Sequence, residues 1–167
     1  ATSDFRVFNY LVASTAGSSA KAGAGLTVRR GGFEDRGLVE AWFTARGRTG
    51  EVQANQLEAT NHGLDKLSRE YAKAGLMRRR ETIIVERGGR AAGFALLEIA
   101  SLGMNFSELT NGFTVHLMED GDVEARRALV EAAKRRYAEL GRAQCIALEE
   151  GEDLSAHEAA GFAKIKE

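Results

Sequence analysis

The sequence predicts an α/β fold built on one mixed sheet, and two observations carry this prediction. Residues 112–148 contain an alternating apolar strand, a long amphipathic helix and a second short apolar run, which together form a βαβ unit with two parallel strands. Residues 81–99 contain two strand-like runs joined by Gly88-Gly89, which is a hairpin signal. Parallel and antiparallel pairs in one chain indicate a mixed sheet, and we expect helices on both of its faces.

The N-terminal part is predicted to contain a strand and a connector ahead of the main domain. Residues 4–13 are rich in strand formers, and the Ser/Ala/Gly-rich residues 14–25 are typical of a flexible linker. We therefore predict an N-terminal strand and linker over residues 1–25 and one α/β domain over residues 26–167. A short strand at 26–30 opens this domain.

Two helices are predicted next, over residues 35–45 and 51–74. In each of them apolar residues recur three or four positions apart, which is the spacing of a helix with one buried face. Asn, His and Gly follow one another at 61–63, so we expect an interruption there. Gly75 ends the second helix.

The remaining elements alternate between strands and helices. An aspartate at 120 or 122 is expected to cap the long helix, and Gly141 to end it. The predicted elements are strands at 81–86 and 91–99, a polar loop at 100–111, a strand at 112–119, a helix at 123–140, a strand at 143–148, a short helix at 154–160 and a last strand at 162–166.

Length and composition exclude several classes of protein. A chain of 167 residues fits one domain, and a net charge of −1 does not indicate a nucleic-acid partner or an anionic membrane surface. Apolar runs fall far short of the roughly 20 residues of a membrane helix. The N-terminus lacks the order of a signal peptide, and the single cysteine, Cys145, excludes an internal disulfide, so we expect a cytoplasmic protein. The three His and one Cys do not follow metal-ligand spacing, so we predict no metal site.

Three short motifs occur in a fixed order within the main domain. They are Leu26–Arg30 followed by Glu34-Asp35, Ile83–Glu86 turning at Gly88-Gly89 and returning through Gly93, and Ala159-Ala160-Gly161-Phe162. In this order they resemble the GNAT acyltransferase superfamily. The resemblance implies a mostly antiparallel mixed sheet with a central parallel splay. It also implies acyl transfer from acetyl-CoA or another acyl-CoA to an amine of a small molecule or a protein.

The chain stops inside what would be the family's penultimate strand, so the last hairpin is incomplete. Two explanations stay open. The strand at 5–13 takes the missing place, or the chain is part of a longer protein.

The loop before the long helix departs from the family's pattern. In the family an Arg/Gln-x-x-Gly-x-Gly/Ala loop binds the pyrophosphate of coenzyme A through backbone N–H groups and the helix N-terminus. The corresponding residues here are Gly121, Glu124 and Arg126, and the carboxylates of Glu119, Asp120 and Asp122 lie nearby. Because carboxylates repel phosphate, the coenzyme site is predicted to be degenerate. Two functions therefore stay open: an acyltransferase-like domain, or a non-catalytic ligand-sensing or interaction module, either of them compatible with a homo-oligomer.

The resemblance suggests where a site would lie. His157 stands at the position of the family's Tyr general acid, although a solvated His on a short surface helix is the simpler interpretation. His116 is a candidate base with Glu98 as its partner, and a hydrogen-bonded core His is the alternative. The resemblance places the donor's pantetheine arm along the backbone of Leu117, Met118 and Glu119, next to Gly121.

A second candidate site is suggested by charge and by loop composition. Arg79 and Arg80 lie in the only basic cluster, which could bind an anionic ligand; a solvated strand entrance is the alternative. Asn105 and Ser107 lie in a polar loop beside the central strand, where a ligand could contact them.

Overall fold

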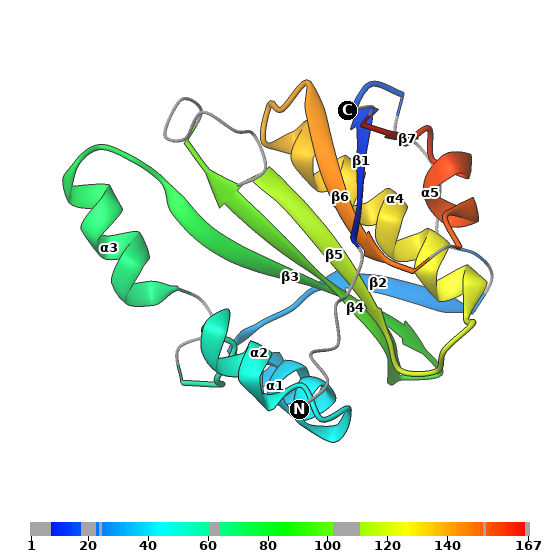
Figure 1. Cartoon of the computed structure of the whole chain (residues 1–167), viewed down its shortest axis with the longest axis horizontal. Helices are drawn as coiled ribbons and strands as arrows, with labels where there is room; N and C mark the ends of the chain where they lie inside the picture. The colour runs from blue at the N-terminus through cyan, green and yellow to red at the C-terminus, as the bar shows by residue number, and fades with distance from the viewer. Residues whose placement is uncertain are drawn as a thin grey trace, which may run out of the picture.

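The computed structural model describes residues 8–17, 23, 25–60, 64–101, 111–151 and 153–165. Within them, seven strands form one sheet in the order β2-β3-β4-β5-β6-β1-β7 (Figure 1). The strands are β1 (Phe8–Ser14), β2 (Leu26–Arg30), β3 (Arg78–Arg87), β4 (Arg90–Ala100), β5 (Gly112–Leu117), β6 (Gln144–Glu150) and β7 (Ala163–Lys164). The pair β5 and β6 is parallel and the other neighbours are antiparallel, which confirms the predicted mixed sheet.

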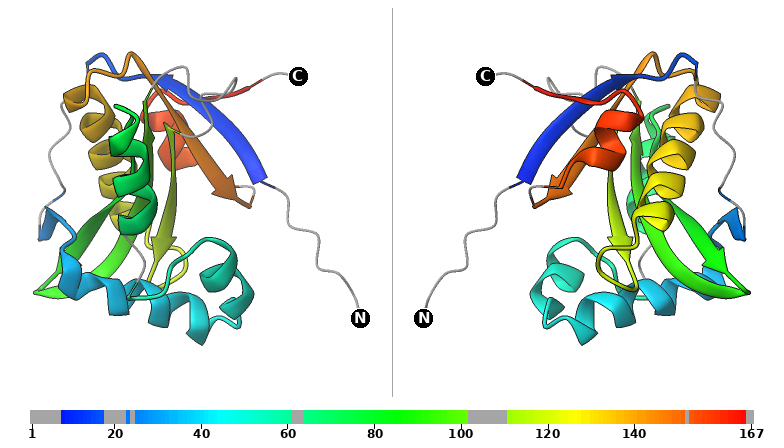
Figure 2. Two further views of the ribbon diagram at one scale, coloured as in Figure 1. Left: turned by 90° about the vertical axis from the view of Figure 1, so that its left-hand side faces the viewer. Right: turned by 90° about the vertical axis from the view of Figure 1, so that its right-hand side faces the viewer.

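Helices lie on both faces of the sheet (Figure 2). The long α4 and the short α5 lie on one face, and α1 and α2 lie at one end of the other face, where they share a core with β3 and β4. The helical elements are η1 (Phe33–Asp35), α1 (Arg36–Ala45), α2 (Thr49–Ala54), α3 (Asp65–Lys73), α4 (Val123–Glu139) and α5 (Ser155–Ala159). No helix in the described ranges is long and apolar enough to cross a membrane.

The two strongest sequence signals are confirmed. Gly88 and Gly89 both have positive φ, at 58° and 75°, which is the backbone conformation that a two-residue hairpin requires. The side chain of Asp122 accepts a hydrogen bond from the Ala125 N–H at 3.0 Å, so it caps α4. Gly141 follows α4 with φ of 73°.

The central splay is also present. Only two residue pairs join β5 to β6, Gly112 with Ile146 and Phe113 with Ala147. Beyond these pairs the two strands diverge toward their C-terminal ends. This divergence leaves room beside the sheet for a cleft.

The N-terminal strand β1 fills the place of the missing last strand. It lies between β6 and β7 and pairs antiparallel with both. Leu11 is 1% exposed and Ala13 is 4% exposed, so β1 contributes to the core beneath α4 and α5. The first of the two explanations placed the N-terminal strand beside the strand at 143–148, and β1 lies there.

The helix predicted over 51–74, with an interruption expected at 61–63, is confirmed only in part. The structure has two separate helices there, because Gln56 and Leu64 adopt positive φ of 53° and 55°, which no α-helix tolerates. Leu57, only 2% exposed, turns into the core beside α1 instead of continuing the helix. The expected break at 61–63 lies outside the described residues.

Candidate active or ligand-binding cleft

A cavity of about 420 Å³ lies where β5 and β6 diverge. Its walls come from the two strands, from β1, β3 and β4, from α1 and α2, and from the first turn of α4. The residues that determine its chemistry are Trp42, Arg48, His116, Arg126, Glu149 and Glu150.

Side chains of α1 occupy the backbone acceptors at the end of β5. The indole N–H of Trp42 donates to the Leu117 carbonyl at 2.7 Å. The Arg46 guanidinium donates to the same carbonyl and to that of Met118, both at 3.1 Å, and stacks 4.1 Å from the centre of the Trp42 ring. The main-chain N–H of Met118 donates to the Ala92 carbonyl at 2.9 Å. The backbone that was expected to hold a pantetheine arm is therefore already hydrogen-bonded within the chain.

The N-terminus of α4 is occupied by acidic side chains. Asp122 caps it, and Arg87 forms ion pairs with Asp122 at 3.0 Å and with Glu124 at 3.4 Å. Glu119 is exposed, Asp120 is 97% exposed in its side chain, and Gly121 forms the turn between the strand and the helix with φ of 88°. Carboxylates thus surround the N–H groups at the start of α4, and one of them, that of Asp122, already caps the helix.

Arg126 bridges α4 and β6 across the splay. Its guanidinium donates to Oε1 of Glu149 at 2.5 Å. Glu149 is 4% exposed, and its second oxygen, Oε2, has no hydrogen-bond partner among the described residues. Burial raises the pKa of Glu149, while the Arg126 charge acts in the opposite direction.

Glu149 is not among the residues predicted from the sequence, because it looks like an ordinary acidic residue at the end of a strand. The alternation of side chains along β6 could have shown that Glu149 points to the buried face of the strand. Glu149 shares its face of β6 with Cys145 and Ala147, both of which are buried beneath α4.

His157 is buried, so the prediction that it is solvated is wrong. It is 0% exposed, and its ring centre lies 6.3 Å from that of Phe113 and 5.7 Å from that of Phe162. Its Nε2 lies 3.6 Å from Oε2 of Glu149. Burial and the nearby Arg126 charge lower the pKa of His157 to about 4, so the imidazole is neutral near pH 7. The residues that line the cavity in the described structure include Glu149 and not His157.

His116 lines the cavity, but the predicted pairing with Glu98 is wrong. The Nε2 of His116 lies 2.8 Å from Oγ1 of Thr114, and the ring stacks on Phe94 at 4.9 Å. Removal from water lowers the pKa of His116 to about 3. Glu98 also lines the cavity, and its carboxylate is paired with arginines of β3 instead. The alternative of a hydrogen-bonded His therefore describes His116 better than the catalytic dyad does.

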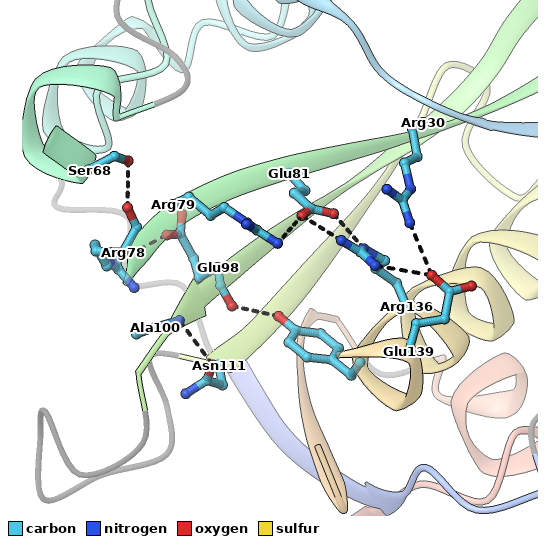
Figure 3. A network of polar contacts seen from close by, with 11 residues as sticks. Arg30, Ser68, Arg78, Arg79, Glu81, Glu98, Ala100, Asn111, Arg136 and Glu139 are labelled. Carbon is cyan, nitrogen blue, oxygen red and sulfur yellow. Dashed lines mark hydrogen bonds and ion pairs between the residues drawn. The ribbon is translucent and has the colours of Figure 1, made fainter. Parts of the chain in front are cut away.

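The basic cluster is part of an ion-pair network that joins β3, β4 and α4 (Figure 3). Arg79 pairs with Glu81 at 2.8 Å, and Arg80 pairs with Glu98 at 2.5 Å. Glu81 also accepts two hydrogen bonds from Arg136, at 2.6 and 2.9 Å. Each of the two arginines expected to bind an anion thus has a carboxylate partner within the chain.

Four residues considered in the sequence remain, namely Asn105, Ser107, His62 and Cys145. Asn105, Ser107 and His62 lie outside the described residues. Burial raises the pKa of the Cys145 thiol to about 12, which agrees with a packing role. In the parts of the chain that the structure describes, no three His, Cys, Asp or Glu side chains gather as they would around a metal ion.

Comparison with solved structures identifies the fold. A GCN5-related N-acetyltransferase from Kribbella flavida aligns with 93% of this chain at a TM-score of 0.56 and 11% identity. A tandem GNAT protein from the clavulanic acid biosynthesis pathway aligns with 97% of it at 0.53 and 13% identity. The chain has the GNAT fold.

This GNAT-fold chain spans about half the length of the structures that it matches. It covers 53% of the Kribbella enzyme, 51% of the tandem protein and 48% of a Drosophila protein that aligns at a TM-score of 0.57 and 12% identity. No family model and no curated protein matches the sequence. The likeness therefore concerns the arrangement of the backbone, and the side chains of the cleft carry the functional argument.

Proposed function

We propose that this GNAT-fold domain is a non-catalytic ligand-binding module that uses the cleft between β5 and β6. One observation carries the proposal: the cleft is open, with a volume of about 420 Å³, while the Leu117 carbonyl beside it is bonded to Trp42 and Arg46. A cavity of this size, with aromatic walls and a few polar groups, is typical of small-molecule sites. The cleft has room for a ligand that does not need the β5 backbone.

The charge at the start of α4 supports the same proposal. Asp122 caps the helix, and the neighbouring Glu119, Asp120 and Glu124 give the end of the cleft negative charge. A ligand that carries a diphosphate would have to displace or neutralise these groups. A ligand without phosphate avoids that cost.

Calorimetric titration with acetyl-CoA and with a longer acyl-CoA tests the proposal. We expect no binding in the micromolar range, because neither the helix N-terminus nor the β5 carbonyl is available to the coenzyme. Micromolar binding by the wild-type domain would contradict the proposal.

A charge-neutralised variant separates the two obstacles to coenzyme binding. Asp120→Asn with Glu124→Gln changes two exposed side chains, so the fold should be kept. If the variant gains affinity that the wild type lacks, repulsion is the main obstacle. If it does not, the occupied β5 carbonyl is sufficient to exclude the coenzyme.

The second candidate is acyl transfer to an amine of a small molecule or a protein. Glu149 favours it, since a buried carboxylate with a raised pKa on the cleft wall could accept a proton from an amine. Glu149 would then be the base, in place of the His116 or Glu98 predicted from the sequence, and the resemblance proposes His157 as the acid. An acyl-transfer assay on His157→Ala tests the role of His157. The turnover rate should fall by more than any loss of folded protein explains. Equal turnover rates in wild type and variant would remove His157 from the mechanism.

A further inference from the structure

The charged side chains at the wall of the cleft balance one another. Each of the five carboxylates that line the cavity has an arginine within 4.0 Å, and five arginines take part in these contacts. The pairs are Glu51 and Glu150 with Arg48, Glu98 with Arg78 and Arg80, Asp120 with Arg46, and Glu149 with Arg126. A charged ligand would lose its hydration in this cleft and meet only charges that are already paired. The wall therefore favours neither a cation nor an anion.

Aromatic rings surround His116 on the α1 side of the cavity. The centre of its imidazole ring lies 4.9 Å from that of Phe94, 4.7 Å from that of Trp42 and 5.0 Å from that of Phe43. His116, Trp42 and Phe43 all line the cavity. The imidazole is neutral near pH 7, because removal from water lowers the pKa of His116 to about 3. These rings give the cleft an uncharged surface that suits another aromatic ring.

His116 and Thr114 place a neutral polar pair within this surface. Nε2 of His116 lies 2.8 Å from Oγ1 of Thr114, and both residues line the cavity. The two side chains carry two polar hydrogens, one on the imidazole and one on the hydroxyl, and the hydrogen bond between them uses one. Among the described residues these side chains make no other hydrogen bond. One donor and at least one acceptor therefore remain for a ligand.

Resting on the proposed function, we propose that the cleft binds an uncharged small molecule that carries an aromatic ring and one hydrogen-bonding group. The ring packs against Trp42 and Phe43, and the polar group bonds to the pair formed by Thr114 and His116. Such a ligand leaves the ion pairs of the wall intact, because it has no charge that competes for them. The cavity of about 420 Å³ has room for one ring with a short side chain.

Three probes that share a phenylpropyl body and differ in charge test this preference. They are hydrocinnamamide, which is neutral, hydrocinnamate and 3-phenylpropylammonium. The reporter is the fluorescence of Trp42, the single tryptophan of the chain, which lines the cavity. We expect the amide to bind at least about tenfold more tightly than either charged probe, because only the charged probes lose strong hydration without gaining a partner.

A double variant assigns the polar contact to the proposed pair. Thr114→Val with His116→Phe keeps the size of both side chains and the aromatic stacking but removes both polar groups. The affinity for hydrocinnamamide should fall about threefold to tenfold, which is the value of one hydrogen bond. Far-UV circular dichroism checks that the variant is folded.

A second variant tests the charge balance and does not depend on the first. Glu150→Gln leaves the wall with one more arginine than carboxylates, and its side chain is 40% exposed, so the fold should be kept. Hydrocinnamate should then gain affinity by about threefold or more, while the amide changes by less than about twofold. Glu124→Gln is the matched control, because it removes an exposed carboxylate that does not line the cavity and should leave all three affinities unchanged.

The outcomes distinguish this inference from the proposed function. Equal affinities for the three probes, or a wild-type preference for either charged probe, would overturn the uncharged ligand and leave binding in the cleft intact. Amide binding that is unchanged in the folded double variant would remove Thr114 and His116 as the contact. If none of the three probes binds, the proposed use of the cleft is overturned together with this inference.

Discussion

Glu149, at the wall of the cleft, and His157, buried behind it, are the two titratable groups next to Arg126. Both have less than a twentieth of their surface exposed, and burial shifts their pKa values in opposite directions, upward for the carboxyl and downward for the imidazole. Both shifts favour the neutral form. Arg126 limits the shift of Glu149 and adds to that of His157, so one guanidinium couples the two sites.

The buried His157 predicts acid sensitivity. Its folded-state pKa is about 4, below the ordinary value of 6.5, so between these values the unfolded chain binds more protons than the folded one. Stability is therefore fully present above pH 6.5 and is lost as the pH falls toward 4. His116, with a pKa of about 3, acts in the same direction, while the raised pKa of Glu149 acts against it.

Urea denaturation of His157→Gln tests this dependence. In the variant, the free energy of unfolding should fall less steeply as the pH is lowered. The slopes of the two proteins should differ by at most about 1.4 kcal/mol per pH unit, which is the contribution of one proton. Wild type and variant are compared at neutral pH and at about pH 5, inside the predicted window. Equal slopes in the two proteins would show that His157 is not the group responsible.

At the scale of elements, the approach of β4 to β5 depends on one glycine. A Cβ at Gly93 would lie 2.7 Å from the His116 carbonyl oxygen and 3.1 Å from Cδ1 of Leu129. The first contact is with backbone in a paired strand, which cannot move without breaking the ladder. The glycine that supports the family resemblance therefore has a packing reason here.

Gly93→Ala is expected to destabilise the domain by about 1–3 kcal/mol, the cost of overpacking a core. Gly37→Ala is the matched control, because a Cβ there meets nothing within 4 Å and the position is helical. It should stabilise by up to about 1 kcal/mol through helix propensity. Thermal or urea unfolding measures both, and a neutral Gly93→Ala would show that the strands have room to separate.

At the scale of the whole molecule, β1 connects the two ends of the chain within one sheet. Its pairs with β6 extend from Phe8 with Glu150 to Ser14 with Gln144, and β7 lies on its other side. Without β1, these two strands would have a gap between them. We therefore predict that the N-terminal strand and the strands of the cleft unfold together.

The variant Leu11→Ala tests whether β1 unfolds together with the rest of the sheet. Leu11 is 1% exposed, so truncation should cost about 2–5 kcal/mol, whereas Tyr10→Ala, at a side chain 43% exposed, should cost much less. Unfolding followed by Trp42 fluorescence and by far-UV circular dichroism should give coincident midpoints in Leu11→Ala. Separate midpoints would mean that β1 unfolds independently of the α1 side of the sheet.

Most of the elements and the class of fold could be predicted from the sequence, because these depend on local patterns. Alternation, helical spacing, the Gly88-Gly89 pair and the Asp122 cap each act over a few residues. Their order supported the GNAT resemblance, and the carboxylates of 119–124 indicated a degenerate coenzyme site. The same local patterns failed at Gln56 and Leu64, where packing imposes a left-handed backbone.

The partners of the cleft side chains could be identified from the folded chain alone. Trp42 meets Leu117 across 75 positions of sequence, and Arg126 meets Glu149 across 23. Hydrogen bonds at such separations depend on the positions of whole elements in space, and no local pattern encodes them. For this reason the sequence indicated a solvated His157 and a pair of His116 with Glu98, and only the folded chain placed Glu149 at the wall of the cleft.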